Sequence, residues 1–209
     1  MIDAALLPLQ RRAMKPTAEK LAGWGVQADH ITLAGFALGA LAVPALAFGL
    51  TLLALGLIFL NRLADGLDGS VARLEGPTDR GAFLDIALDF VFYALVPLGF
   101  AIMNPGANGL PAAVLIAAFV GTGSSFLAFA VIAQKRGDQA NDYPTKGIYY
   151  LGGLTEGAET IAVFVAMCLW PALFPILAYA FAAACALTTV MRWRQGWRSF
   201  APQGDHGPS

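Results

Sequence analysis

Charged residues are scarce in this chain of 209 residues: Lys, Arg, Asp and Glu together make up 13%, against 57% hydrophobic residues. Typical soluble domains carry about 25% charged residues, so a soluble fold of this size could not hide so much apolar surface. The composition predicts an integral membrane protein, and the length suits one domain. Because the net charge is only −1, no overall field attracts nucleic acid, and we expect no nucleic-acid partner.

Cysteine is almost absent as well. Cys168 and Cys185 lie within apolar segments and lack the spacing of metal ligands, so we expect them to be small packing residues. A cleavable signal is also missing, because the first apolar run long enough to cross a membrane begins after residue 30 and no short apolar core with a small-residue cleavage site precedes it.

Apolar stretches predict an all-α integral membrane protein with six transmembrane helices. A helix needs about 20 residues to cross a bilayer. The second stretch reaches that length only if it is read through to Arg73, and the fifth only if it starts near Tyr150. The stretches cover about 31–50, 51–64, 82–103, 110–133, 158–173 and 174–191.

Basic residues support the count of six. All 13 Lys and Arg residues precede the first span, lie between the second and third or between the fourth and fifth, or follow the sixth. They therefore share one side of the membrane, which the positive-inside rule identifies as cytoplasmic. We expect a multi-pass protein of the inner (cytoplasmic) membrane, with both termini on the cytoplasmic side.

The two ends of the chain differ from the spans. Residues 1–24 combine an apolar three-then-four spacing with basic residues on the opposite side. This fits either a short amphipathic helix along the membrane interface, interrupted at Pro16, or a basic segment without structure. Residues 201–209 are polar and rich in Gly and Pro, which predicts a disordered tail. Residues 1–200 would form a single membrane domain around a motif at 61–89.

Four aspartates surround the junction between the second and third predicted helices. Asp65 and Asp68 are three residues apart and share a helix face, and Asp85 and Asp89 are four apart, about 6 Å along the axis. A tight helical hairpin would point the two pairs at each other. Two like charges about 4 Å apart repel by about 4 kcal/mol at an effective dielectric constant of 20, and Asp89 lies well inside an apolar run, where acids are costly and usually functional.

Protons or divalent cations would relieve this repulsion. Hard oxygen ligands suit Mg²⁺, Mn²⁺ or Ca²⁺, and two divalent ions would neutralise four aspartates. Glycines support a ligand at the same place, because Gly66 and Gly69 each cost a helix about 1 kcal/mol relative to Ala. Their missing side chains would let a bulky ligand approach the backbone. Arg73, one turn past Gly69, is placed to hold a phosphate.

The run Asp65-x2-Asp68-Gly69-x2-Ala72-Arg73-x7-Gly81-x3-Asp85-x3-Asp89 resembles the signature of the CDP-alcohol phosphotransferases at all eight fixed positions. The resemblance implies an enzyme of phospholipid biosynthesis that transfers the phosphatidyl group of CDP-diacylglycerol to an alcohol and releases CMP. It also implies two divalent ions, Mg²⁺ or Mn²⁺, and a homodimer. The metal ligands would be Asp65, Asp68, Asp85 and Asp89, with Asp89 also the base that takes the acceptor proton; Gly69, Ala72, Arg73 and Gly81 would line the CDP site.

Two further elements of the resemblance concern the nucleotide. Family members often carry a short Asp/Asn-x-x-Thr element at the start of the first span, and here Asp29 and Thr32 occupy its positions. Thr78, three residues before Gly81, matches a hydroxyl position of some members, although the gap after Arg73 is one residue shorter than in many relatives. The resemblance implies that these side chains close on the nucleotide.

The acceptor is not determined by the sequence. Cations near the predicted active-site surface would suit a phosphorylated acceptor such as glycerol 3-phosphate or inositol phosphate, or they only set the orientation in the membrane. These cations are Lys135, Arg136 and Lys146, with Arg192 and Arg194 after the sixth span. Glu156 and Glu159, one turn apart, would suit an amine or polyol acceptor, or they only complement the dipole of the fifth helix.

Two other classes of function are open to the same residues. A divalent-cation carrier also needs acids within helices, but its polar residues should track across the membrane, and here the acids cluster at one surface. A non-catalytic relative of the enzymes should have lost an aspartate of the motif, and none is lost. The sequence therefore favours the transferase.

Overall fold

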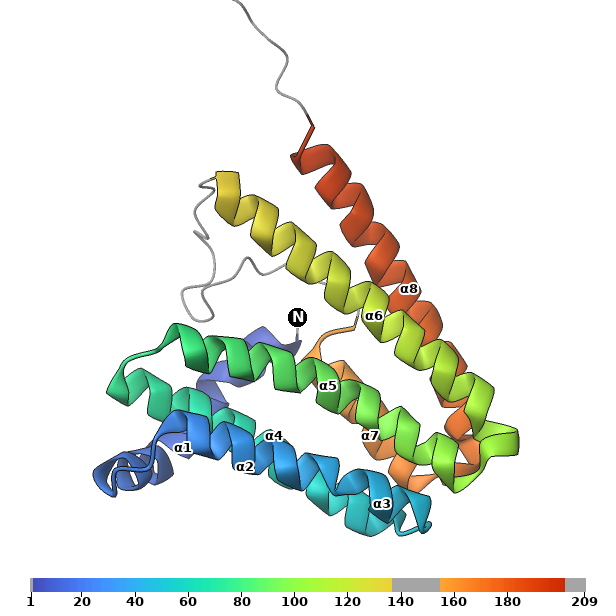
Figure 1. Ribbon diagram of the computed structural model, residues 1–209, viewed down its shortest axis with the longest axis horizontal. Helices are drawn as coiled ribbons and strands as arrows, with labels where there is room; N and C mark the ends of the chain where they lie inside the picture. The colour runs from blue at the N-terminus through green and yellow to red at the C-terminus, as the bar shows by residue number, and fades with distance from the viewer. Residues whose placement is uncertain (1, 137–154, 202–209) are drawn as a thin grey trace, which may run out of the picture.

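The computed structural model describes residues 2–136 and 155–201, and every regular element in these ranges is a helix. Figure 1 shows the long helices packed side by side, with α6 and α8 forming a pair that extends beyond the others. In chain order the helices are α1 (Ile2–Gly23), α2 (Ala28–Ala40), α3 (Ala42–Ala47), α4 (Thr51–Glu75), α5 (Asp79–Met103), α6 (Pro105–Arg136), α7 (Gly157–Leu169), the 3-10 turn η1 (Pro171–Leu173) and α8 (Phe174–Ser199). The expected tail at 201–209 lies, apart from residue 201, outside the described residues.

Within the described residues, four helical segments are long and apolar enough to cross a membrane. They are Ala28–Ala47, Asp79–Met103, Pro105–Arg136 and Pro171–Ser199. The chain is therefore an all-α, multi-pass membrane protein. Helix α4 is not in this set because the charged motif occupies its C-terminal half, and α7 is apolar but only 13 residues long. The count of six spans stays a prediction.

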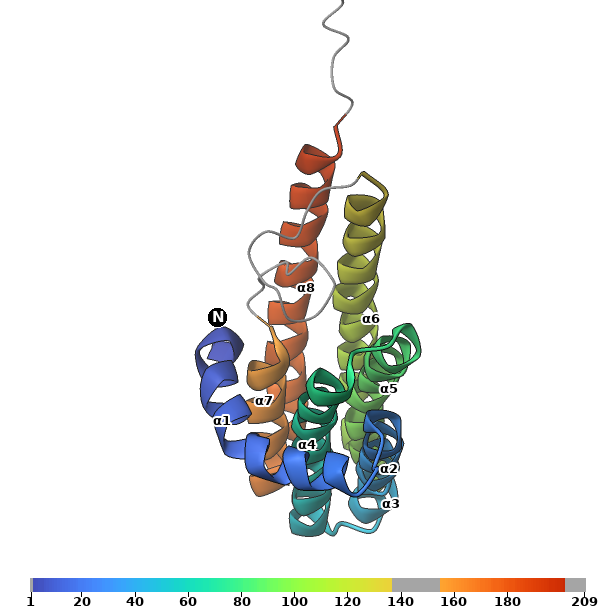
Figure 2. The same ribbon diagram turned by 90° about the vertical axis from the view of Figure 1, so that its left-hand side faces the viewer.

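Helix α1 is longer than the sequence predicts. It runs for 22 residues through Pro8 and Pro16, so the expected interruption at Pro16 is wrong. Figure 2 shows that α1 bends instead of ending, which is the usual effect of a proline within a helix. Its second half is held by packing, because Ala18 is buried and α1 contacts α4 and α7. The location of α1 at the membrane interface stays a prediction.

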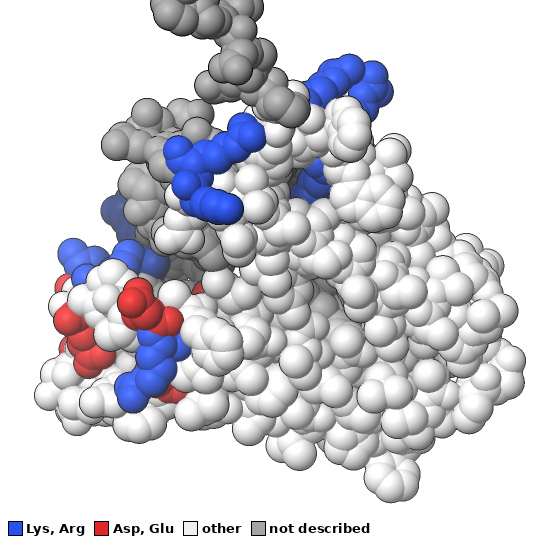
Figure 3. Space-filling model, turned by 45° about the horizontal axis from the view of Figure 1, so that its top comes forward, with Lys and Arg blue, Asp and Glu red and all other residues white. Residues whose placement is uncertain are grey.

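A continuous apolar core joins α3, α4, α5, α6, α7 and α8. Phe100 of α5 stacks on Phe174 of α8 with ring centroids 4.5 Å apart, and Phe164 of α7 is fully buried in the same core, against the ring of Phe119. Large apolar side chains such as Phe48 and Ile176 are also exposed on the outside. Figure 3 shows charged side chains at one end of the visible face and an uncharged surface over the rest, as expected for a surface that lies in lipid.

Helix α2 lies unusually close to α4. A Cβ atom added to Gly35 would lie 2.4 Å from Cβ of Ala64, and one added to Gly39 would lie 2.9 Å from Nδ2 of Asn61. Only glycine permits such an approach between helix backbones. The amide of Asn61 uses the short separation, because it donates a hydrogen bond of 3.0 Å to the carbonyl oxygen of Gly35. This close packing determines where the aspartate motif of α4 lies relative to α2.

Candidate metal and nucleotide site

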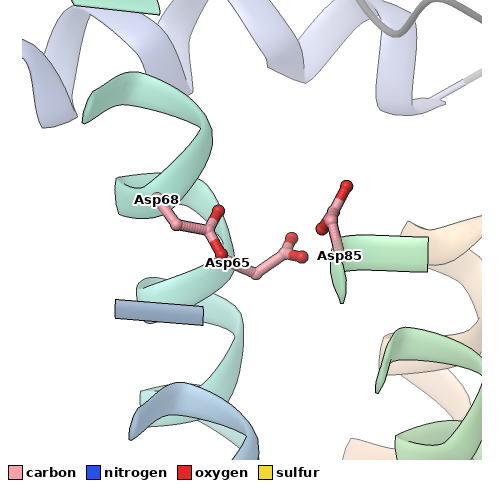
Figure 4. A group of neighbouring side chains, drawn as sticks. All are labelled: Asp65, Asp68 and Asp85. Carbon is pink, nitrogen blue, oxygen red and sulfur yellow. The ribbon is translucent and has the colours of Figure 1, made fainter. Parts of the chain in front are cut away.

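Three of the four aspartates of the motif converge. Asp65 and Asp68 project from α4 and Asp85 from the start of α5, and each offers a carboxylate oxygen within 4.8 Å of the other two. Figure 4 shows the three carboxylates directed toward a common space. Oxygen ligands stand about 2.0–2.6 Å from Mg²⁺ or Ca²⁺, so oxygens bound to one ion lie up to about 4–5 Å apart. We refer to Asp65, Asp68 and Asp85 as the three-aspartate group, and their spacing and chemistry fit one divalent cation.

Local structure brings α5 to this position. Gly76 ends α4 with a φ of 100°, in the left-handed region that favours glycine. Thr78 then caps α5, since its hydroxyl accepts a hydrogen bond of 3.0 Å from the backbone N–H of Gly81. The two helices are thus joined by residues 76–78, and the first turns of α5 carry Asp85 back toward α4.

Thr32 orients one member of the group. Its hydroxyl, on α2, donates a hydrogen bond of 2.6 Å to Oδ2 of the buried Asp68. The contact depends on the close packing of α2 on α4, because Gly35 lies one turn further along α2. The family resemblance implies that Thr32 lies near the nucleotide, and in the structure its hydroxyl contacts the Asp68 carboxylate that would face the metal. Its contact with a nucleotide stays a prediction.

Asp29, Thr78 and Gly81 come together at the start of α5. Nε of Arg80 donates a hydrogen bond of 2.6 Å to Oδ2 of Asp29, which links α2 to α5. A Cβ added to Gly81 would lie 3.1 Å from both Oδ1 of Asp29 and Oγ1 of Thr78. These three residues, which the resemblance assigns to the nucleotide, are therefore neighbours in space. Arg80 joins them, although sequence reasoning counted it only among the ordinary charges of the hairpin.

The remaining nucleotide candidates lie on the last turns of α4. Nη2 of Arg73 donates a hydrogen bond of 3.0 Å to Oγ of Ser70, and Nη1 lies 3.5 Å from where a Cβ on Gly69 would stand. The guanidinium of Arg73 therefore folds back over Gly69. Ala72 is half-buried beside it. This arrangement places a cation next to a stretch of uncovered helix backbone, as a phosphate would require.

Asp89 is not in the three-aspartate group. Its Oδ1 lies 2.7 Å from Nη2 of Arg62, whose Nη1 lies 3.8 Å from Oδ2 of Asp65. Sequence reasoning counted Arg62 only among the basic residues that set the orientation. One signal was available, because Arg62 precedes Asp65 by three residues and so shares its helix face.

Two of the three acceptor candidates of the fourth-to-fifth connection lie in the last turn of α6. Lys135 is exposed at the end of α6, and Lys146 lies outside the described residues. Arg136 donates hydrogen bonds of 2.9 Å to the carbonyl oxygens of Ser199 and Phe200, so it secures the end of α8. An acceptor role for these cations stays a prediction.

Glu156 and Glu159 form the capping box of α7, in which each side chain accepts a hydrogen bond from the backbone of the other. Arg192 ties α8 to α6 by donating to the carbonyl oxygen of Thr122 at 3.0 Å and by lying over the ring of Phe126. The glutamates therefore have a structural role, while Arg192 remains a half-buried cation within the helix bundle.

The sequence matches a family model and two proteins that are named as a membrane protein and a synthase. A family model described as CDP-alcohol phosphatidyltransferase matches residues 26–191. Inner membrane protein YnjF of Escherichia coli (strain K12) is 50% identical over 197 residues, which are 94% of this chain and 96% of that protein. Archaetidylinositol phosphate synthase of Methanothermobacter thermautotrophicus is 36% identical over 93 residues, 44% of this chain and 46% of that enzyme.

Solved structures share the fold. Phosphatidylinositol phosphate synthase of Mycobacterium tuberculosis with CDP-DAG bound has a TM-score of 0.68 at 22% identity and covers 95% of this chain and 98% of its own. The same synthase in complex with manganese and citrate has a TM-score of 0.71 at 21% identity, with coverages of 94% and 93%.

Proposed function

The chain belongs to the CDP-alcohol phosphatidyltransferase family, and on this premise we propose that it transfers the phosphatidyl group of CDP-diacylglycerol to the hydroxyl of a small phosphorylated alcohol, releasing CMP. The enzyme class follows from the family. The donor, the acceptor and the roles of individual residues are the proposal, and the donor is supported by the CDP-DAG named with the structurally similar synthase.

The observation that carries the proposal is the convergence of Asp65, Asp68 and Asp85 within 4.8 Å. Such a group is costly beside an apolar helix bundle unless cations neutralise it. Bound there, a divalent ion would neutralise the pyrophosphate of the donor and the charge that develops on the leaving CMP. The manganese named with the similar synthase supports this assignment. The group supplies ligands for one ion, and a second would need Asp89.

Other residues of the site would bind the donor and accept the proton of the acceptor. Arg73, Thr78, Gly81 and Asp29 would bind the nucleotide end of the donor, since they lie at the end of α4, at the start of α5 and in the first turn of α2. Asp89 would take the proton of the acceptor hydroxyl while the oxygen of that hydroxyl attacks the β-phosphorus and the bond between the β-phosphorus and CMP breaks. The ion pair with Arg62 fixes the orientation of the Asp89 carboxylate for this step.

We propose a phosphorylated acceptor for two reasons. The names of both synthases describe an inositol phosphate lipid as the product. In this chain the capping box engages Glu156 and Glu159, which were the residues that favoured an amine, whereas Arg192 is a cation held within the bundle by α6. A phosphate monoester suits such a cation. We further propose that the site faces the cytoplasm, as the 13 basic residues indicate, and that the protein is a homodimer.

The test is CMP release by the purified protein in detergent, with labelled CDP-diacylglycerol and Mg²⁺ or Mn²⁺. Inositol phosphate and glycerol 3-phosphate would be compared with inositol and glycerol. We expect release with a phosphorylated acceptor and none without a divalent ion. Release only with an unphosphorylated alcohol would refute the acceptor. No release with any alcohol, together with Mn²⁺ flux in liposomes, would refute the transferase in favour of a carrier.

A further inference from the structure

Arg62 lies between two of the predicted metal ligands and is held there by groups that are not aspartates. Its Nε and Nη2 donate hydrogen bonds of 2.9 and 2.7 Å to Oδ1 of Asn61. Its guanidinium carbon stands 4.8 Å from the ring centroid of Phe92 and 5.5 Å from that of Tyr93. The side chain is only 18% exposed. The guanidinium is thus fixed on several sides.

Asn61 is itself anchored. It is buried, and its amide donates to the carbonyl oxygen of Gly35 across the closest approach of α2 and α4. Because the amide nitrogen is engaged by Gly35, the amide oxygen is presented to Arg62. The contacts with Asn61, Phe92 and Tyr93 do not depend on the charge state of any carboxylate, so they hold Arg62 in place whether or not an ion occupies the three-aspartate group.

The position of Arg62 is where a second ion would have to bind. A pair of divalent ions in one site stands about 3.5–4 Å apart and shares ligands. Next to an ion in the three-aspartate group, the second would bridge Asp89 and one shared aspartate. Arg62 already makes that bridge, with Nη2 at 2.7 Å from Asp89 and Nη1 at 3.8 Å from Asp65. A guanidinium is permanently charged and is more weakly hydrated than an ammonium, which suits a partly buried position.

We propose that Arg62 takes the place of the second divalent cation, so that the site of this chain holds one ion in the three-aspartate group and one fixed guanidinium beside Asp89. The inference rests on the proposed metal site. It departs from the two ions that the motif implies. Arg62 would act as a positioning residue that orients Asp89 and supplies a positive charge which cannot dissociate.

The test counts metal ions without relying on catalysis. Purified protein in detergent is titrated with Mn²⁺, with and without CDP, and the bound ions per chain are measured by elemental analysis and by electron paramagnetic resonance. We expect one Mn²⁺ per chain in both conditions, with the spectrum of an isolated ion. The Arg62→Met variant should bind two per chain and show spin coupling between neighbouring ions. The exposed Arg194 provides the matched control: Arg194→Met should bind one.

Each outcome decides between the alternatives. Two ions per wild-type chain in either condition would overturn the proposal, and this count needs no variant to fold. A folded Arg62→Met protein that still binds one ion would also overturn it. Asp68→Asn should abolish binding, which verifies that the counted ion is in the three-aspartate group. If the wild type binds no ion, the proposed metal site fails as well. If it binds two and releases CMP, this inference alone fails.

Discussion

The substitution Gly35→Ala tests whether the close packing of α2 on α4 assembles the site. The added methyl group would stand 2.4 Å from Cβ of Ala64, whereas carbon atoms in contact prefer about 3.5–4.0 Å. The helices must therefore separate by roughly 1–1.5 Å at this level. That displacement would stretch the hydrogen bond from Thr32 to Asp68 from 2.6 Å to beyond the useful limit of about 3.5 Å.

The size of the effect follows from this displacement. Overpacking of this kind costs about 1–3 kcal/mol of folding free energy, which thermal unfolding in detergent would show as a lower melting temperature. A misplacement of about 1 Å at a catalytic group costs about 10²-fold in rate, so CMP release should fall by that factor. Mn²⁺ binding should weaken in parallel, because Asp68 loses the group that orients it.

The control is Gly56→Ala on α4, where an added Cβ meets nothing within 4 Å. In a helix alanine is more favourable than glycine by up to about 1 kcal/mol, so this variant should be as stable as the wild type or more so. If Gly35→Ala matched Gly56→Ala in melting temperature, Mn²⁺ binding and CMP release, the claim that this contact positions the site would be refuted.

Other substitutions test single contacts. Asp85→Asn should abolish Mn²⁺ binding and CMP release, while Asp79→Asn, an exposed change on the same helix, should leave both unchanged; equal losses would remove the reason for a specific metal site. Thr32→Val should weaken Mn²⁺ affinity by about 10- to 100-fold, since it removes the hydrogen bond to Asp68, and an unchanged titration would contradict this. Asn61→Leu should lower stability by about 1–3 kcal/mol, because it removes the buried hydrogen bond to Gly35 and the acceptor of two donors of the mostly buried Arg62; an unaltered melting temperature would count against the anchoring role.

The sequence predicted the parts of the fold that depend on local spacing. Apolar runs located the long helices, and the spacing of Asp65 and Asp68 placed them on one helix face. The family prediction is confirmed by the match over residues 26–191. The expected interruption of the N-terminal helix at Pro16 is wrong, because α1 continues to Gly23 and its second half packs against α4 and α7.

What the sequence did not predict depends on contacts between helices. Helical spacing could not show that Asp89 meets Arg62 while Asp85 meets Asp65 and Asp68, because this depends on the rotation of α5 relative to α4. The role of Asn61 was equally hidden, since it arises only where two glycines let α2 approach. By contrast, Glu156 and Glu159 stand three residues apart before an apolar run, which is the spacing of a capping box, although Glu156 replaces the usual Ser or Thr.

Every carboxylate of the motif belongs to a helix that continues from the site toward the opposite end of the bundle. Helix α5 carries Asp85 and Asp89 in its first turns and extends without a break to Met103, over 25 residues or about 37 Å. A thinner bilayer makes such a helix tilt to match the shorter hydrocarbon layer. Because Asp85 is rigidly attached to that rod, tilting would move it relative to α4. Membrane thickness, set by the acyl chain length of the surrounding lipids, would thereby alter the distances within the three-aspartate group.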